Sequence, residues 1–263
     1  MSGMATVPSR PERRIVVAGR TLDGPAVVVA FAVVVALVGL AFSQALPLAV
    51  FSGLVAVGVE LPLLVAVALQ LLLIELVGFG GATWAYLRLR SLTVAYVDVR
   101  RPTRRDLGWM LGGSLLVLVL YFGVVSVALA AGVPMARSGI SVAGEANPSI
   151  LLLLAALSFL LIGPMEELFF RGIVQGTMRE VLSPTLAVLL ASVTFAAIHY
   201  LTLVGPLAGK LVLVGSLLVT SLVFGFAYER TGNLLVNAVV HGTYNAVLLL
   251  LAYVVFSSGM VPA

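Results

Sequence analysis

The sequence contains no cysteine, which excludes disulfide bonds, zinc sites built on thiolates and a cysteine nucleophile. Charge is also scarce. Asp, Glu, Lys and Arg make up 10% of the residues, whereas ordinary soluble domains carry about 25%. A chain with so few charged side chains cannot cover a globular surface with polar groups. The composition therefore excludes a soluble globular protein.

Long apolar runs dominate the sequence instead. Hydrophobic residues make up 61% of the 263 residues, and the mean hydropathy is +1.18. A membrane-spanning helix needs about 20 apolar residues, and the uncharged stretches predict seven such helices. They cover about residues 25–45, 61–87, 107–133, 149–178, 184–204, 211–228 and 234–256. The predicted fold class is all-α: a polytopic membrane helical bundle that forms a single domain over residues 25–263.

The stretch 24–59 carries no charge and is too long for one simple span. Pro47 and the polar pair Ser43 and Gln44 predict that the first helix ends near residue 45. Residues 46–59 are then expected to form a short outer segment, with a re-entrant loop as one open interpretation. An eighth transmembrane helix results if this segment crosses the bilayer or pairs with a neighbour.

The basic residues predict the orientation, because Lys and Arg in short loops stay on the cytoplasmic side. On one side of the predicted bundle lie Arg10, Arg13, Arg14, Arg20, Arg88, Arg90, Arg100, Arg101, Arg104, Arg105, Arg179 and Arg230. The opposite loops carry Arg137 and Lys210. We therefore expect a multi-pass protein of the cell membrane with its amino terminus in the cytoplasm. The arginines are interpreted as topology and lipid-headgroup contacts, and no nucleic acid partner is expected.

Residues 1–24 contain Pro8, Pro11 and several charges, which predicts a flexible cytoplasmic tail. A secretory signal would have a short apolar core and a small-residue cleavage site, and neither is present.

Ionisable side chains inside hydrocarbon cost at least about 2.5 to 3.5 kcal/mol each, so each one is a candidate functional residue. Both histidines of the chain fall inside predicted spans. The intramembrane ionisable residues are Glu75, Glu166, Glu167, Arg171, His199 and His241. Such a short inventory of costly groups predicts one polar centre within the bundle.

The fourth helix carries two adjacent glutamates. Residues four apart share a helix face, so Glu167 is expected to pair with Arg171 while Glu166 points elsewhere. Pro164 removes one helical hydrogen bond just before the carboxylates, and a kink is expected there. Two interpretations of the Glu167 and Arg171 pair stay open: an ion pair that locks helices together, or a part of the catalytic machinery.

The fifth and seventh helices repeat the four-residue spacing. Phe195 and His199 share one face, and His241 and Asn245 share another. One free carboxylate, two imidazoles and one amide on three helices are difficult to explain by packing alone. For Glu75, which lies outside these pairs, we expect a protonated packing residue.

These motifs resemble those of the CPBP intramembrane proteases, also called the Abi or CAAX-protease family, which includes the prenyl-protein endopeptidase Rce1. The family pattern is two adjacent glutamates with an arginine four residues after the second, then Phe-x-x-x-His and His-x-x-x-Asn. The sequence matches it in order and spacing, and the resemblance covers about residues 150–250. The matching residues are Glu166, Glu167, Arg171, Phe195, His199, His241 and Asn245.

The resemblance implies an intramembrane endopeptidase that cleaves a CAAX peptide, prenylated or not, or a leader peptide. Peptide hydrolysis needs an activated water and a group that stabilises the oxyanion. Glu166 and His199 are the candidates for activating water, and His241 and Asn245 are the candidates for facing the oxyanion. Glu167, Arg171 and Phe195 are then supporting residues.

The sequence does not decide whether the site uses a metal ion. Glu166, His199 and His241 could supply three ligands to a Zn²⁺ ion with an open position for water. The same residues could activate water without an ion, and the sequence has no His-Glu-x-x-His helix that would favour zinc.

Two alternatives belong to other functional classes. A proton-coupled transporter would use Glu75, Glu166 and the histidines as a relay. A membrane scaffold or immunity factor would bind a partner and need no cleavage. Hydrolysis by the purified protein, lost when Glu166 is replaced, separates an enzyme from both alternatives.

Overall fold

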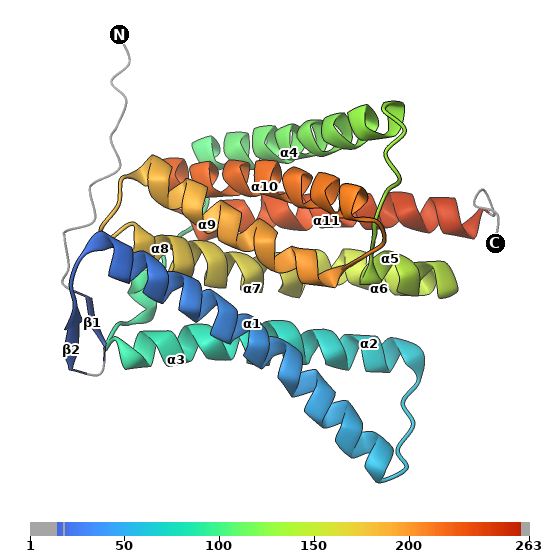
Figure 1. The fold of residues 1–263 in the computed structure, drawn as a ribbon, viewed down its shortest axis with the longest axis horizontal. Coiled ribbons are helices and arrows are strands. Elements are labelled where there is room, and N and C mark those ends of the chain that lie inside the picture. Colours follow the sequence, from blue (N-terminus) through green and yellow to red (C-terminus); the bar gives the residue numbers. More distant parts are fainter. Residues whose placement is uncertain (1–14, 18, 259–263) are drawn as a thin grey trace.

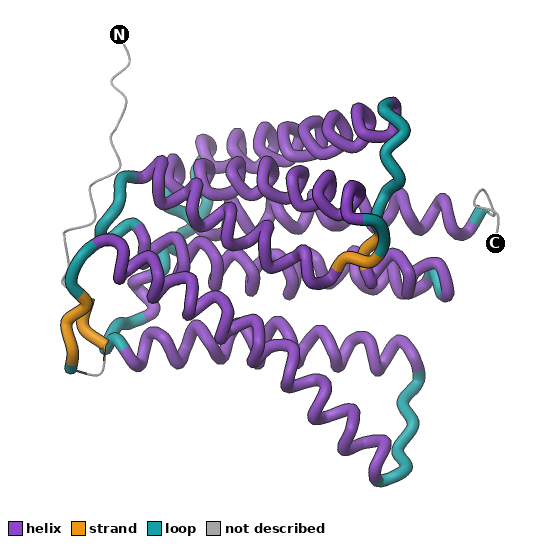
Figure 2. Tube along the Cα trace, in the orientation of Figure 1, coloured by secondary structure: helices purple, strands orange, loops and turns teal. Residues whose placement is uncertain are grey.

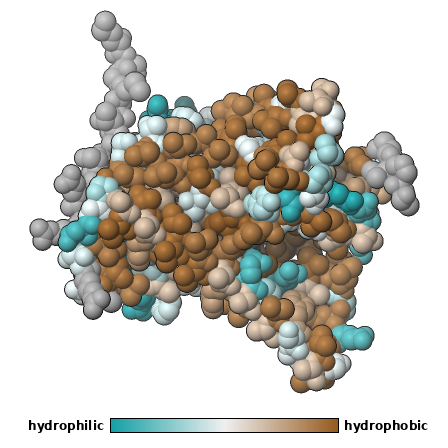
Figure 3. Space-filling model, in the orientation of Figure 1, coloured by the Kyte–Doolittle hydropathy of each residue, from teal (hydrophilic) through white to brown (hydrophobic). Residues whose placement is uncertain are grey.

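The computed structural model describes residues 15–17 and 19–258 (Figure 1). Within these residues, seven helical spans are long and apolar enough to cross a membrane. Figure 2 shows that most of the described chain is helical. The short strands pair as two 2-stranded sheets. Apolar side chains cover most of the visible face, as a surface in contact with lipid requires (Figure 3). The predicted all-α polytopic bundle is confirmed.

The spans are continuous helices, two of which contain wide turns with π-helical hydrogen bonding. The first three are α1 (Pro25–Ala56), the run of α2 (Leu63–Leu71), η1 (Leu72–Gly80) and α3 (Gly81–Leu89), and α4 (Arg104–Ala130). The fourth is the run of α6 (Ser149–Leu157), η3 (Ser158–Ile162), α7 (Gly163–Glu167), η4 (Leu168–Gln175) and α8 (Gly176–Met178). The last three are α9 (Pro184–His199) with η5 (Tyr200–Thr202), α10 (Leu207–Thr231) and α11 (Leu234–Ser257).

Short elements join the spans at both ends. The hairpin of β1 (Ile15–Val17) and β2 (Arg20–Leu22) precedes α1, and η2 (Val94–Tyr96) lies in the loop before α4. At the opposite end, β3 (Arg137–Ser138) pairs with β4 (Leu203–Val204), and α5 (Gly139–Ala146) follows β3.

The first helix corrects one prediction. Residues 46–56 continue α1 through Pro47, so they form neither a separate outer segment nor an eighth helix. A proline removes only one helical hydrogen bond, whereas an irregular segment in hydrocarbon would leave many backbone groups unpaired. Pro47 is buried, and the turn before it is reinforced by the Ser43 hydroxyl, which donates to the carbonyl of Leu40 at 2.8 Å.

The amino-terminal segment corrects a second prediction. The flexible tail expected for residues 1–24 is wrong for Ile15–Val17 and Arg20–Leu22, which pair as two antiparallel strands. Gly19, with φ of 79°, adopts the left-handed conformation that its tight turn needs, and Ile15 is buried. Residues 1–14, which include Arg10, Arg13 and Arg14, and residues 259–263 lie outside the described part of the chain.

The fourth span is the most buried of the seven and runs through the middle of the bundle (Figure 1). It packs against α1, α9, α11 and the η1 segment. Two wide turns, η3 and η4, flank the short α7 that carries both glutamates. Wide turns inside helices are frequent at functional sites, and here they coincide with the predicted polar centre.

Candidate active site

Glycines allow the seventh span to touch the fourth directly. A Cβ atom added to Gly163 would lie 2.9 Å from the carbonyl of Ala238 and 3.1 Å from the amide of Gly242. A Cβ added to Gly242 would lie 2.7 Å from the Phe159 ring. Neither position has room for a larger residue, so the glycines set the close spacing between α7 and α11. This contact brings His241 to the two glutamates.

Glu167 is completely buried and fully paired. Its Oε1 contacts Nδ1 of His241 at 3.0 Å. Its Oε2 accepts from Nε of Arg171 at 3.0 Å and from the Asn237 amide at 3.1 Å. The pairing of Glu167 with Arg171 expected from the sequence is therefore present, and two residues of α11 join it.

Arg171 is held by more than its ion pair. The guanidinium donates to the Ser221 hydroxyl of α10 at 2.9 Å. Its Cζ lies 5.3 Å from the centre of the Phe195 ring and 5.7 Å from that of Phe224, which is the range of cation–π attraction. A buried charge is tolerated when a counter-charge and hydrogen bonds surround it, and Arg171 has both.

Glu166 has the opposite surroundings. Its Oε2 lies 3.8 Å from Nε2 of His241, which is beyond hydrogen-bonding distance. That oxygen is buried and has no hydrogen-bond partner among the described residues. His241 thus presents one ring nitrogen to each glutamate, and the ring of Phe224 stacks on it at 4.9 Å.

His199 is oriented by its own helix. Its Nδ1 lies 2.8 Å from the carbonyl of Phe195, so Nδ1 carries the hydrogen and Nε2 is left free. The Phe195 ring lies 4.4 Å from the His199 ring and 6.1 Å from the His241 ring, between centres. Phe195 therefore lies in contact range of both histidines, on the side of Arg171.

Asn245 lies one turn after His241 on α11 and is partly exposed. Across residues 15–17 and 19–258, its side chain makes no hydrogen bond, and neither Asn245 nor His199 contacts Glu166 by a hydrogen bond or an ion pair. The structure thus joins Glu167, Arg171 and His241 by hydrogen bonds and brings Glu166 within 3.8 Å of His241, while His199 lies on α9 and Asn245 one turn further along α11.

Residues 148–247 match the protein family described as type II CAAX prenyl endopeptidase Rce1-like. This segment is Rce1-like. The match confirms the resemblance drawn from the motifs, and all seven motif residues fall within the Rce1-like segment. No curated protein and no solved structure matches the chain. With its seven spans, the chain is a multi-pass membrane protein, and the match supports a CAAX-type endopeptidase in general.

The three candidate zinc ligands are Glu166, His199 and His241. A zinc site needs at least three donors converging on one point. Within the described ranges, no three His, Asp or Glu side chains gather in this way. Nδ1 of His241 is engaged by Glu167, and only its Nε2 faces Glu166. Glu166, His199 and His241 therefore do not fit a metal centre in this structure.

Three residues of the Rce1-like site were missing from the sequence prediction: Asn237, Ser221 and Phe224. Asn237 had a usable signal, because it lies four residues before His241 and shares its helix face. No sequence pattern indicates Ser221 or Phe224, since their contacts depend on how α10 is rotated relative to the helix that carries the two glutamates.

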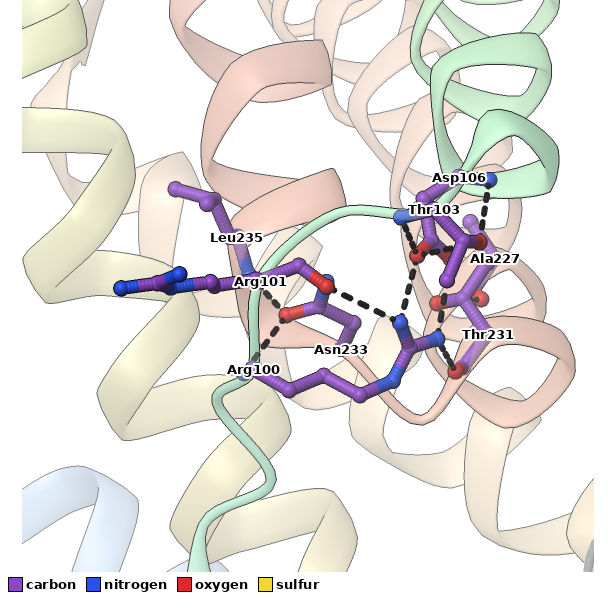
Figure 4. Close-up of polar contacts among 8 residues, drawn as sticks. All are labelled: Arg100, Arg101, Thr103, Asp106, Ala227, Thr231, Asn233 and Leu235. Carbon is purple, nitrogen blue, oxygen red and sulfur yellow. Dashed lines mark hydrogen bonds and ion pairs between the residues drawn. The ribbon is translucent and has the colours of Figure 1, made fainter.

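A cluster of hydrogen bonds around Arg100, which we call a polar clamp, lies at the end of the bundle where α11 begins (Figure 4). Arg100 donates to Asp106 at 2.6 and 3.0 Å and to the carbonyl of Thr231 at 2.7 Å. The backbone amide of Arg100 donates to the Asn233 side chain at 3.2 Å, and Asn233 caps α11. The hydrogen bonds to Asp106 raise the pKa of the Arg100 guanidinium.

A second clamp at the same end holds the second span to the end of the fourth. Arg90 donates to both carboxylate oxygens of Glu180, at 2.8 and 3.0 Å, and Tyr96 donates to Glu180 at 2.6 Å. Burial disfavours the charge of Arg90, but the hydrogen bonds to Glu180 and Tyr86 outweigh it and raise the pKa of the guanidinium. Both clamps lie away from the glutamates and support the helices that carry them.

Proposed function

We propose that the chain is an intramembrane endopeptidase in which Glu166 is the general base that activates water. One observation carries this proposal. Of two adjacent glutamates, Glu167 is completely buried and fully paired, whereas Glu166 is half-buried and has an unpaired, buried Oε2 at 3.8 Å from a histidine. Unpaired carboxylate oxygens are costly in an apolar interior and are retained where chemistry needs them.

Glu167 and its partners orient the imidazole in this proposal. The carboxylate accepts from Nδ1–H of His241 and thereby turns Nε2 toward Glu166. A water beside Glu166 gives up a proton to that carboxylate while its oxygen attacks the substrate carbonyl carbon. The free Nε2 of His199 holds the same water.

Asn245 and His241 stabilise the oxyanion, His241 through a hydrogen on Nε2, because its Nδ1–H is donated to Glu167. The Asn245 amide has no hydrogen-bonding partner in the described chain and lies on the same face of α11 as His241. An amide of this kind donates to the oxygen on which negative charge develops. When the carbon–nitrogen bond breaks, Glu166 returns the proton it took from water to the leaving amine.

The substrate is proposed to be a peptide that reaches the site at the membrane. The Rce1-like match supports a CAAX-type peptide, which is prenylated in the proposed reaction, and a leader peptide is the other class tested. The arginine distribution supports an amino terminus in the cytoplasm, with the chain in the cell membrane.

The test uses purified protein in lipid vesicles with prenylated and unprenylated CAAX peptides and a leader peptide. Glu166→Gln keeps the size and hydrogen bonding of the side chain, so the protein stays folded while cleavage falls by about 100-fold or more. Glu60→Gln is the matched control, because Glu60 is exposed in the loop after α1 and should leave cleavage unchanged. Full activity in Glu166→Gln would reject the proposed mechanism.

The same assay tests the metal question. Because Glu166, His199 and His241 do not gather as a ligand set, a chelator should leave cleavage unchanged. Loss of cleavage on chelation, restored by Zn²⁺, would show instead that these side chains rearrange around an ion.

A further inference from the structure

Glu75 is a buried carboxyl group that the proposed mechanism does not use. It lies on the wide-turn segment η1 of the second span, and only 4% of its surface is exposed. Its Oε2 is buried and has no hydrogen-bond partner within the described residues. A packing residue was expected at this position, but packing does not require a carboxyl group with a free oxygen.

The packing of the second span against the fourth places Glu75 beside the candidate active site. The two spans run in the same direction (Figure 1). Phe79, about one turn after Glu75, contacts Phe170 with ring centres 5.7 Å apart, and Phe170 lies one turn after Glu166. Glu75 and Glu166 each lie about one turn before these phenylalanines, on two spans that run in the same direction.

The segment η1, which carries Glu75, packs against α7, which carries Glu166. In the described chain, Oε2 of Glu75 and Oε2 of Glu166 are the buried carboxylate oxygens without a hydrogen-bond partner. The two unpaired oxygens therefore belong to the same small region of the bundle.

Within the described residues, Glu75 forms no ion pair with a cation. Of the elements packed against η1, α1 and η3 contain no titratable residue, and α7 contributes Glu166 and Glu167. The η4 segment contributes Arg171, which is engaged by Glu167. Within the second span, other titratable groups occur only toward the far end of α3.

We propose that Glu75 is the proton-holding partner of Glu166, so that the two side chains form a carboxyl pair with one proton between them. Two neighbouring carboxylates in apolar surroundings do not both ionise, and they titrate as a pair. This inference rests on the proposed function, because it assigns Glu75 a task in the reaction of Glu166. Glu75 acts through Glu166 and is a positioning residue.

The reaction balances with this pair. In the proposed reacting state, Glu75 holds the proton and donates a hydrogen bond to the ionised Glu166, a bond that the described structure does not contain. A carbon–oxygen bond forms as water attacks, and the water proton moves to Glu166, so that the pair holds two protons. The carbon–nitrogen bond then breaks, its electron pair stays on nitrogen, and the nitrogen takes the second proton. The pair ends with one proton, as it began.

Three properties of Glu75 variants test the inference. Glu75→Met removes the donor at similar volume and should lower kcat by about tenfold or more with KM unchanged. Glu75→Gln keeps a neutral donor and should recover part of that loss. The alkaline limb of the wild-type kcat profile, where the pair loses its proton, should be absent in Glu75→Gln because an amide does not ionise.

A spectroscopic measurement gives a result independent of cleavage. Difference infrared spectroscopy at neutral pH should show the carbonyl band of a protonated carboxyl group in the wild type. The band should be lost in Glu75→Gln and kept in the exposed control Glu60→Gln. If Glu75→Met does not fold, the band and the pH profile of Glu75→Gln decide.

The failures of the two proposals can be told apart. Wild-type kcat and pH profile in both Glu75 variants would overturn the carboxyl pair and leave the protease proposal intact. Full cleavage in Glu166→Gln would reject the protease proposal, while the infrared band would still report whether Glu75 holds a proton. Absence of the band from the wild type would overturn the pair.

Discussion

Two sides of one helical turn differ sharply in this protein. On one side, Glu167 has Arg171, Asn237 and His241 as partners and is fully buried. On the other, Glu166 has a buried oxygen without a partner. The two adjacent glutamates therefore differ in their hydrogen bonding. We call the side of Glu167, where both carboxylate oxygens have partners, the saturated side, and the side of Glu166 the unsaturated side. In the proposed mechanism, the saturated side supports the fold and orients groups, while the unsaturated side carries out the chemistry.

The largest effect on the saturated side is expected from Arg171→Ala. It leaves Glu167 buried without its counter-charge, so the free energy of unfolding should fall by about 3 to 5 kcal/mol. Reversible unfolding in mixed detergent micelles measures the loss. Combining Arg171→Ala with Glu167→Gln removes the stranded charge and should recover stability. Lack of recovery would mean that Arg171 mainly stabilises another contact, with Ser221 as the first suspect.

On the unsaturated side, Asn245→Ala should slow cleavage by about 100-fold, the usual effect of removing one oxyanion donor. Its side chain makes no hydrogen bond in the described structure, so the free energy of unfolding should not change. Steady-state kinetics and unfolding are measured on the same preparation. If Asn245→Ala lowered the free energy of unfolding and left kcat normal, Asn245 would support the fold and would not act on the substrate.

Asn237→Ala should have the smallest effect of the three. It removes hydrogen bonds to Glu167 and to the carbonyl of Phe224, and a hydrogen bond to a charged group is worth about 1.5 to 3 kcal/mol. Unfolding should therefore become easier by that amount, and kcat should fall less than in Asn245→Ala. A larger loss of kcat than of stability would show that Asn237 acts on His241 through Glu167.

The sequence predicted those features that depend on local spacing. The scarcity of charge located the spans, and a four-residue interval predicted the Glu167 and Arg171 pair. The end of the first helix was predicted wrongly, because Pro47 was treated as a breaker in a setting where helix is the only backbone that satisfies its own polar groups.

Features that depend on the register between helices were not predictable. The contact of Ser221 with Arg171 needs the rotation of α10, and the proximity of Glu75 to Glu166 needs the alignment of the second and fourth spans. No pattern within either segment encodes these distances, since each helix is compatible with several rotations until all are packed.

The contact through Gly163 and Gly242 has a mechanical consequence. Because backbone atoms of the two helices meet there, their separation does not depend on the rotamers of intervening side chains. That contact sets how far α11 stands from α7, and so the positions from which the side chains of Glu166 and His241 reach toward each other. A methyl group added at Gly163 would lie 2.9 Å from the Ala238 carbonyl, and one added at Gly242 would lie 2.7 Å from the Phe159 ring, so the two helices would have to shift.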